Sequence, residues 1–320
     1  MNKLLVICGP TATGKTGLAL RLADRFNGEL VSADSRQVYK YMNIGTGKDV
    51  PEDFWPEISN IPFQGRKVPY LTNGKTRIWG YDLVHPKEEF SVAQYVDIAH
   101  AIISHILREG KLPILVGGTG LYIKSVTDGI ATSTVPKNYG LRKVLETKTV
   151  EKLGVGLGRL DPARLEAMNA SDRANPRRLI RAIEIASYKG TPVLPNASTY
   201  DTLRIGLSLK KEELDVRINA RVEARVRAGM REEIAGLLEK GVRWSSQSTS
   251  SIGYRQWKGY FKEEVSLSEA VSAWKSAEEK YAKRQKTWFK RDERIRWFDV
   301  SKEDYLKEIE KTVKKWYSSK

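Results

Sequence analysis

The stretch LLVICGPTATGKT, residues 4–16, constrains the fold of this 320-residue chain more than any other part of it. Its first five residues are apolar, which is typical of a strand buried on both faces of a parallel sheet. The next eight match the phosphate-loop pattern G-x-x-x-x-G-K-[ST]. An amphipathic helix is expected to follow, with Gly28 placed to end it. Strand, loop and helix in this order predict an α/β fold in which helices flank a parallel sheet.

The phosphate loop predicts a site for a di- or triphosphate. Backbone N–H groups of residues 11–16 and the N-terminus of the following helix would converge on one anion. Lys15 would reach the terminal phosphates, and the Thr16 hydroxyl would ligate Mg²⁺. A chance glycine turn before an ordinary helix is the alternative, which the order of the elements disfavours. The expected diphosphate-binding residues here are Gly9, Pro10, Thr11, Ala12, Thr13, Gly14, Lys15 and Thr16.

Positive charge is concentrated in the later part of the chain. The formal net charge is +16, of which residues 1–120 carry +2 and residues 121–320 carry +14. This asymmetry favours a polyanionic partner for the later part. From charge alone, surface lysines and arginines that serve only solubility explain it equally well. The 40% hydrophobic and 29% charged residues are typical of a globular chain rather than a disordered one.

The few cysteines and histidines limit the metal and redox chemistry of this chain. Cys8 is the only cysteine, which excludes internal disulfides and a cysteine-based zinc site. The three histidines, at 85, 100 and 105, do not form a metal-binding pattern. The first residues resemble a lipoprotein signal, but the apolar run is short and continues into the phosphate loop. No stretch approaches membrane-span length, so we expect a cytoplasmic protein without a membrane partner.

Two further expected strands end in polar residues. A strand at residues 29–32 runs into Asp34, and a strand at residues 113–116 runs into GGTG, which contains Thr119. Residues just past the carboxyl ends of strands in an open parallel sheet face the ligand crevice. Asp34 could therefore act as an acid or base, contact Mg²⁺, or cap the following segment. Thr119 could donate a hydrogen bond to a ligand or cap the helix that begins near Leu121.

Weaker patterns separate these strands. Residues 49–61 are acidic and interrupted by prolines, which indicates a loop. Residues 67–81 predict a β-hairpin with Asn73-Gly74 at its turn, as a decoration of the core near residues 62–84. The apolar period from Ser91 to Gly110 predicts a helix.

The strand pattern stops between residues 127 and 199, which divides the chain into two predicted domains. Residues 1–126 and 200–320 would form the catalytic core, and residues 127–199 a helical insertion. Helices are expected in the insertion at residues 141–149, 162–168 and 176–189. Arg177 and Arg181 would share one face of the last helix.

The second part of the core carries a basic pattern. Residues 214–239 predict one long helix, on which Arg217, Arg221 and Arg225 form a stripe at a spacing of four. Such a stripe is a solvated edge or, if it borders the crevice, a phosphate clamp. Residues 251–256, SIGYRQ, predict a compact loop with a stacking ring. Residues 268–291 predict a basic, aromatic helix suited to RNA or to docking Trp288 into the core. Strands are expected at residues 205–209 and 294–299.

Taken together, these motifs resemble those of the tRNA dimethylallyltransferase (tRNA isopentenyltransferase) family. They occur in the same order as in the family and span nearly the whole chain. The matching stretches are GPTATGKT at 9–16, DSRQVY at 34–39, IGTGK at 44–48, FSVAQY at 90–95, GGTGLY at 117–122, NPRRLIRAIE at 175–184, RINARV at 217–222, IGYRQ at 252–256 and RQKTWFKR at 284–291. Gly120 departs from the larger apolar residue usual in the family, which would loosen that turn. The region 49–84 is longer than expected, and the insertion after Gly129 is short.

The resemblance implies a P-loop NTPase-like core with an inserted tRNA-binding domain. It implies transfer of a dimethylallyl group from dimethylallyl diphosphate, rather than chemistry on ATP, to N6 of the adenosine next to the anticodon. Asp34 would be the general base, and Lys15, Thr119, Arg217 and Arg221 would lie along the diphosphate and reaction channel. The implied tRNA contacts are Asp34, Ser35, Arg36, Gln37, Thr119, Arg142, Arg177, Arg178, Leu179, Ile180, Arg181, Gly253, Tyr254, Arg255 and Gln256.

Two other enzyme activities stay open at this point. An adenylate prenyltransferase would perform the same chemistry on a free nucleotide, and a P-loop kinase would use ATP as donor. A non-catalytic RNA-binding protein is a more distant alternative. The strand at residues 113–116 ends in Gly-Gly-Thr rather than in an aspartate, which disfavours the kinase. We expect Mg²⁺ as cofactor, the tRNA anticodon stem-loop and dimethylallyl diphosphate as partners, and a monomer.

Overall fold

The structure, a computed structural model, describes residues 2–129, 132, 135–190 and 200–319. The chain forms two compact units. Unit 1 combines Met1–Thr127 with Ser198–Lys320, and unit 2 is Asp128–Ala197. Within the described ranges, no helix is both long enough and apolar enough to cross a bilayer.

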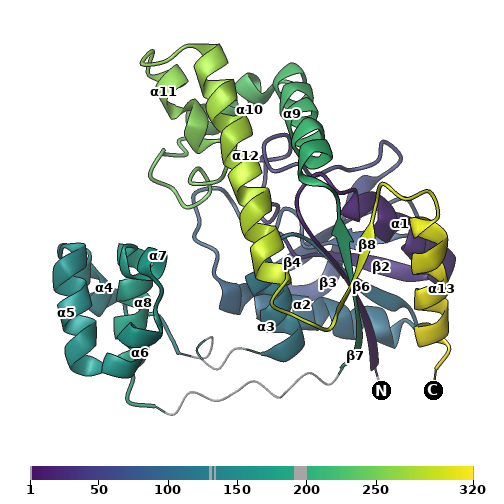
Figure 1. Ribbon diagram of the computed structural model, residues 1–320, viewed down its shortest axis with the longest axis horizontal. Coiled ribbons are helices and arrows are strands. Elements are labelled where there is room, and N and C mark those ends of the chain that lie inside the picture. Colours follow the sequence, from purple (N-terminus) through teal and green to yellow (C-terminus); the bar gives the residue numbers. More distant parts are fainter. Residues whose placement is uncertain (1, 130–131, 133–134, 191–199, 320) are drawn as a thin grey trace. The chain divides into compact units, whose positions relative to one another are not determined.

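Unit 1 is built on one mixed sheet whose strands follow the order β3-β4-β5-β2-β6-β1-β7-β8 (Figure 1). From β5 to β8 the neighbouring strands pair in parallel, whereas β4 is antiparallel to both of its neighbours. The strands are β1 (Asn2–Cys8), β2 (Gly28–Ser32), β3 (Trp55–Phe63), β4 (Arg66–Thr72), β5 (Arg77–Trp79), β6 (Leu112–Val116), β7 (Tyr200–Ser208) and β8 (Ile295–Asp299).

Helices cover both faces of this sheet. The helices outside unit 2 are α1 (Lys15–Phe26), α2 (Val92–Arg108), α3 (Gly120–Asp128), α9 (Lys211–Arg227), α10 (Met230–Glu239), α11 (Lys258–Phe261), α12 (Leu267–Phe289) and α13 (Tyr305–Tyr317), with a 3₁₀ turn η2 (Arg255–Trp257). Alternate residues of β1 enter different cores: Leu4 and Val6 join one, and Leu5 and Ile7 join the other. The predicted strand buried on both faces is thereby confirmed.

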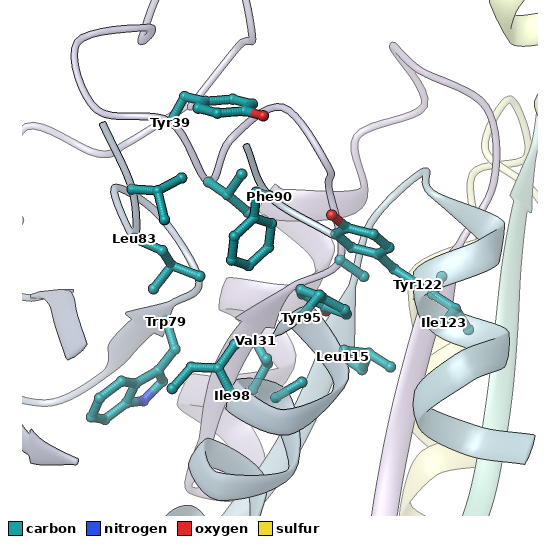
Figure 2. Packing of buried hydrophobic residues seen from close by; sticks show 14 of the residues in the cluster. Val31, Tyr39, Trp79, Leu83, Phe90, Tyr95, Ile98, Leu115, Tyr122 and Ile123 are labelled. Carbon is teal, nitrogen blue, oxygen red and sulfur yellow. The ribbon is translucent and has the colours of Figure 1, made fainter. Parts of the chain in front are cut away.

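The two cores are formed by different helices. In the first, Tyr95 and Ile98 of α2 pack toward Val31 of β2 and Leu115 of β6 (Figure 2). In the second, α1 and α13 lie side by side against the sheet (Figure 1). Phe26 of α1 meets Tyr317 of α13 edge to face. Both cores pack against the parallel strands, whose carboxyl ends lie together at one end of the sheet.

The region before the hairpin differs from its prediction. Residues 49–61 were expected to be a loop, but β3 begins at Trp55 and pairs with β4. The predicted hairpin is confirmed as β4 and β5, since Thr72 pairs with Arg77. It is not a decoration, however, because β5 pairs in parallel with β2 and continues the main sheet. The prolines of β3 are tolerated because that strand lies at the sheet edge.

Two helix boundaries also differ from the sequence predictions. The helix expected at residues 214–239 is broken into α9 and α10, because Gly229 adopts a φ of 99° as the N-cap of α10. An apolar repeat of four does not reveal such a break. Helix α1 ends at Asn27, whose φ is 50°, rather than at Gly28, which already belongs to β2.

Unit 2 is entirely helical where the structure describes it. Its helices are α4 (Tyr139–Leu145), α5 (Val150–Leu160), α6 (Pro162–Ala167), α7 (Ala170–Arg173) and α8 (Pro176–Ala186). Leu153 and Leu157 of α5 pack with Leu179 and Ile183 of α8 in its core. The sequence predictions missed α5 and α7. Three glycines weaken the helical signal of α5, and packing on α8 compensates for them.

Candidate functional site

The phosphate loop curls back on itself between β1 and α1. Gly9 has a φ of 136°, and a Cβ there would lie 2.5 Å from the Leu207 carbonyl oxygen, so only glycine fits. The Lys15 Nζ and the Thr13 hydroxyl both donate to the Pro10 carbonyl oxygen, at 2.6 and 2.9 Å. Burial of the Lys15 amine, followed by the nearby Arg221 cation, lowers the pKa of Lys15 to about 8. The loop therefore holds a desolvated positive charge.

Three strand ends meet at this loop because β2, β6 and β1 are neighbours in the sheet. The Gly117 amide donates to the Ile7 carbonyl at 3.1 Å, and the Ala33 amide donates to the Val116 carbonyl at 2.7 Å. A Cβ on Gly117 would lie 2.3 Å from the Ala33 carbonyl oxygen, so glycine permits this close approach. The polar residues after each strand are thus brought together, as parallel topology requires.

A cavity of about 820 Å³ opens at this edge and lies within unit 1. It is lined by Lys15 and Thr16 from the phosphate loop, by Asp34 after β2, and by Arg217 and Arg221 of α9. The sequence predictions for these five residues thus converge on one space. The phosphate loop and the Asp34 carboxylate thus share the same cavity.

Asp34 has a structural contact as well as a place on the cavity wall. Its Oδ1 accepts a hydrogen bond from the Arg36 amide at 2.8 Å, which closes an Asx turn. The segment that follows is a turn rather than a helix, so there is no helix for Asp34 to cap. Thr119 lies beside it: its amide donates to the Ala33 carbonyl at 3.1 Å, and its Oγ1 accepts from the Ser35 amide at 3.1 Å. Two hydrogen bonds therefore join segment 33–35 to the turn of Gly117–Thr119.

The arginine stripe of α9 borders the cavity and becomes more buried along the helix. Arg217 is exposed, Arg221 is half-buried and Arg225 is buried. Arg221 donates to the Thr11 hydroxyl at 3.1 Å and pairs with Asp49 at 2.6 Å. Arg225 pairs with Glu278 of α12 at 3.4 Å. The stripe is therefore part of the cavity wall rather than a solvated edge.

The segment IGTGK packs on these guanidinium groups. Gly47 has a φ of 62°, and a Cβ there would lie 1.8 Å from Nη2 of Arg225 and 2.5 Å from Nη2 of Arg221. Glu233 of α10 holds the segment by accepting hydrogen bonds from three backbone amides. The Tyr254 hydroxyl donates to the same carboxylate at 2.6 Å. Sequence reasoning missed Glu233, because nothing near it in the chain signals this contact.

The ring of Tyr254 does not have the role expected of it. It is fully buried, and a Cβ on Gly45 would lie 2.5 Å from its Cζ atom, so it cannot stack on a base in this conformation. Arg255 next to it is exposed and lines the cavity. Gln256 caps its own loop by accepting from the Gly253 amide at 2.9 Å.

Helix α12 contributes residues that the sequence analysis did not assign. Gln285 is buried; its Oε1 accepts from the Thr11 amide at 2.8 Å, and its Nε2 donates to the Gly118 carbonyl at 3.0 Å. The Thr11 amide, one of the expected phosphate-binding groups, is therefore already engaged. The Tyr281 side chain lines the cavity and lies next to the Thr119 side chain. Burial raises the pKa of Tyr281, with a further increase from Asp34, so its hydroxyl stays protonated.

Trp288 explains the departure at Gly120. A Cβ on Gly120 would lie 2.1 Å from Cδ1 and Nε1 of the Trp288 indole, so this ring occupies the space beside the glycine. The turn is therefore packed rather than loosened. Trp288 as a whole remains 43% exposed, so it is only partly docked, and a contact of its ring with RNA stays a prediction.

Two of the predicted tRNA contacts in unit 1 serve the site itself. Gln37 donates to the Gly47 carbonyl at 2.9 Å and accepts from the Ser32 hydroxyl at 2.7 Å. Arg36 donates to the Gln247 carbonyl at 3.0 Å. Both residues line the cavity, so they shape its wall whether or not they meet a ligand.

Unit 2 engages most of its predicted contact residues internally. Arg142 forms two bonds, of 2.6 and 2.7 Å, to the Glu184 carboxylate, and Arg181 bonds the same group at 3.2 Å. Arg178 pairs with Asp172. Leu179 and Ile180 are buried in the core of the unit, so their side chains hold α8 in place. Arg177 is exposed at the start of α8.

Comparison with known proteins places these features in a family. The model described as IPP transferase matches residues 37–292, and the model described as isopentenyl transferase matches residues 2–61. A tRNA dimethylallyltransferase of Roseiflexus sp. (strain RS-1) is 37% identical over 324 residues, covering 99% of each chain. The crystal structure of the tRNA isopentenylpyrophosphate transferase of Bacillus halodurans matches with a TM-score of 0.71 and 34% identity, over 99% of this chain and 97% of that one. A eukaryotic dimethylallyltransferase acting on tRNA matches with a TM-score of 0.75 and 25% identity, over 98% and 78%.

Proposed function

The chain belongs to the tRNA dimethylallyltransferase family, and on this premise we propose its reaction. It transfers a dimethylallyl group from dimethylallyl diphosphate to N6 of the adenosine adjacent to the anticodon in tRNA and releases diphosphate. The observation that carries the proposal is that Lys15 of the phosphate loop and Asp34 line one cavity. Prenyl transfer needs an anion site for the leaving group beside a proton acceptor for the incoming amine.

The leaving group acquires negative charge as the C–O bond breaks. Lys15, Arg217 and Arg221 supply positive charge around the cavity without having to reorganise. Arg221 is held for this role by the Thr11 hydroxyl and by Asp49. Loop amides other than that of Thr11 complete the anion site. This arrangement stabilises diphosphate at the moment it departs.

The acceptor amine is a poor nucleophile because its lone pair is delocalised into the purine. Asp34 would accept the proton from N6 as the new C–N bond forms, an effect of about 10²–10⁴-fold in rate. One of its oxygens is engaged by the Arg36 amide, which fixes the carboxylate in place. Tyr281 lines the same cavity, and the Thr119 hydroxyl accepts from the Ser35 amide next to Asp34, which supports its geometry.

Magnesium fits this site as a partner of the substrate. Among the described residues, no group of three or more His, Cys, Asp or Glu side chains could hold a metal by itself. Mg²⁺ usually keeps several waters and binds phosphate oxygens with one or two protein ligands, and the Thr16 hydroxyl on the cavity wall can be one of them. When bound, the ion supplies positive charge to the departing diphosphate.

The net charge of +14 over residues 121–320 supports tRNA as the polyanionic partner. Exposed Arg177 in unit 2 and exposed Arg255 in unit 1 are the cations we assign to the RNA backbone. The target adenosine must leave its stack to enter the cavity. Since Asp34 and the phosphate loop come from one chain, a monomer suffices for the reaction. We assign the protein to the cytoplasm, where its tRNA substrate is found.

The test offers both donors to the purified protein. Labelled dimethylallyl diphosphate and labelled ATP are incubated separately with bulk tRNA, and dimethylallyl diphosphate also with AMP. We expect acid-stable label on tRNA from dimethylallyl diphosphate alone. Label from ATP would favour a kinase, and label on AMP an adenylate prenyltransferase.

The assignment of Asp34 has its own variant. Asp34→Ala should abolish dimethylallyl transfer while tRNA binding persists, because the carboxylate acts on the proton rather than on the RNA backbone. Single-turnover rates and a tRNA-binding titration measure the two effects. An Asp34→Ala enzyme as active as the parent would remove the general-base role.

A further inference from the structure

Helix α12 presents one face to the turn of Gly117–Gly120. Tyr281, Gln285 and Trp288 follow each other at helical spacings of four and three, so they share that face. Tyr281 lies next to the Thr119 side chain, Gln285 donates to the Gly118 carbonyl, and Trp288 covers Gly120. The three contacts fall on three consecutive residues of one turn.

Gln285 differs from its two neighbours because it also bonds the phosphate loop. Its two ends serve different segments: Oε1 accepts from the Thr11 amide and Nε2 donates to the Gly118 carbonyl. Only 5% of the side chain is exposed, and a Cβ on Gly118 would lie 2.1 Å from its Nε2. The carboxamide therefore fills the space between the loop and the turn, with both polar ends satisfied.

The Gly117–Gly120 turn is also hydrogen-bonded to the segment that carries Asp34. The Thr119 amide donates to the Ala33 carbonyl, and the Thr119 hydroxyl accepts from the Ser35 amide. A continuous path of hydrogen bonds thus runs from the phosphate loop through Gln285 and the turn to both sides of Asp34. One end of this path is the phosphate loop, which holds the diphosphate in the proposed reaction. The other end is Asp34, which faces the acceptor amine.

We propose that Gln285 is a positioning residue that sets the separation between the departing diphosphate and the acceptor amine. The inference rests on the function proposed above. Reacting atoms must approach to about 3–3.5 Å with aligned orbitals, and a misplacement of about 1 Å can cost a hundredfold in rate. Gln285 holds the phosphate loop against the Asp34–Thr119 side at the spacing that this approach requires.

Misplacement has a chemical signature distinct from loss of fold. If the C–O bond to diphosphate breaks while N6 is out of reach, water forms the new bond to the allylic carbon. Diphosphate then leaves with the electron pair, water releases a proton to solvent, and dimethylallyl alcohol replaces modified tRNA as the product. The fraction of donor converted to alcohol therefore reports on positioning.

The experiment compares three variants of the full chain. Gln285→Met keeps the size of the side chain but removes both bonds, and Gln285→Glu keeps the acceptor for Thr11 but cannot donate to Gly118 when ionised. Thr287→Ala is the matched control, because Thr287 is exposed on the same helix and its hydroxyl bonds the Lys283 carbonyl of that helix. Single-turnover transfer, alcohol formation, and affinities for inorganic diphosphate and tRNA are measured for each.

We expect Gln285→Met to lower transfer by about a hundredfold and to raise the alcohol fraction, with both affinities retained. Gln285→Glu should be intermediate, and Thr287→Ala should match the parent. Unchanged transfer in Gln285→Met, or a proportional loss of transfer and both affinities, would overturn the inference. If Gln285→Met does not fold, Gln285→Glu decides by the same criteria.

A second experiment disturbs the contact between Gly118 and Gln285 from the side of the turn. Gly118→Ala should displace the Gln285 carboxamide, and the double variant Gly118→Ala with Gln285→Ala should be no slower than the slower single variant. Fully additive losses would contradict the shared path. A parent enzyme that transfers no dimethylallyl group would instead refute the proposed function, which keeps the two failures distinguishable.

Discussion

Two sets of arginines in this protein were predicted from sequence to bind anions, and the structure treats them differently. On α9, Arg217, Arg221 and Arg225 border a cavity next to the phosphate loop; Arg221 and Arg225 also pair with Asp49 and Glu278, whereas Arg217 is exposed. In unit 2, Arg142 and Arg181 converge on the buried carboxylate of Glu184. Positive charge in a sequence thus does not reveal which cations are available to a ligand, because a nearby acid can neutralise them inside the fold.

The strongest test of this contrast removes a cavity cation. Arg217→Gln should slow dimethylallyl transfer by about a hundred- to a thousandfold, since it removes a charged contact to the leaving group. Affinity for tRNA should change little. Single-turnover kinetics measure the first effect, and Arg227→Gln, an exposed residue at the end of the same helix, is the control. Equal effects of the two variants would erase the distinction between cavity and surface arginines.

The next test breaks the internal cluster of unit 2. Glu184→Gln should lower the free energy of local unfolding of this unit by about 2 kcal/mol, because Arg142 and Arg181 lose their shared carboxylate. Hydrogen exchange of α5 and α8 measures the loss. Transfer in the folded enzyme should persist. A variant with parental protection would show that the cluster contributes nothing to stability.

The same cluster should respond to acid. Burial raises the pKa of Glu184, but hydrogen bonds from Arg142, the Asn138 amide and Arg181 outweigh it, so the pKa is lowered overall. A carboxyl whose pKa is lower in the folded than in the unfolded chain stabilises the fold fully at pH above the unfolded-state pKa. That stabilisation is lost as the pH falls through the folded-state pKa. This acid sensitivity should be absent in Glu184→Gln.

A smaller effect concerns the cation of the phosphate loop. Because burial and Arg221 lower the pKa of Lys15 to about 8, its amine loses its proton above that pH in the free protein. Since diphosphate binds the protonated amine, affinity for inorganic diphosphate should weaken by up to about tenfold per pH unit above this value. Calorimetric titration measures it, with Lys15→Arg as the variant whose charge persists. A flat profile in the parent would contradict the shift.

The smallest expected effect belongs to the exposed arginine of unit 2. Arg177→Ala should weaken tRNA binding severalfold and reduce the slope of log affinity against log salt by about one, as for one lost phosphate contact. Transfer at saturating tRNA should match the parent. Lys311→Ala, an exposed change on α13, serves as control. An unchanged slope would remove Arg177 from the RNA interface.

Sequence reasoning located much of the site because its signals are local. The glycines of the phosphate loop, Asp34 after one strand and Thr119 after another each follow a strand directly, and parallel topology brings strand ends together. It failed where partners are distant in the chain: Glu233 holds amides almost 190 residues away, and β5 extends the sheet through pairing with β2. Neither contact leaves a periodic or compositional trace near the residues involved.

By itself, the sequence determined the phosphate-loop motif, since a buried strand, glycines that adopt special backbone angles and a lysine occupy thirteen consecutive residues. Only the tertiary structure decided which charges face the cavity and which are neutralised within the fold. It alone also revealed Gln285, whose bond to Thr11 spans 274 residues. Local backbone preferences are written in neighbouring residues, whereas the pairing of a buried polar group depends on what packing brings beside it.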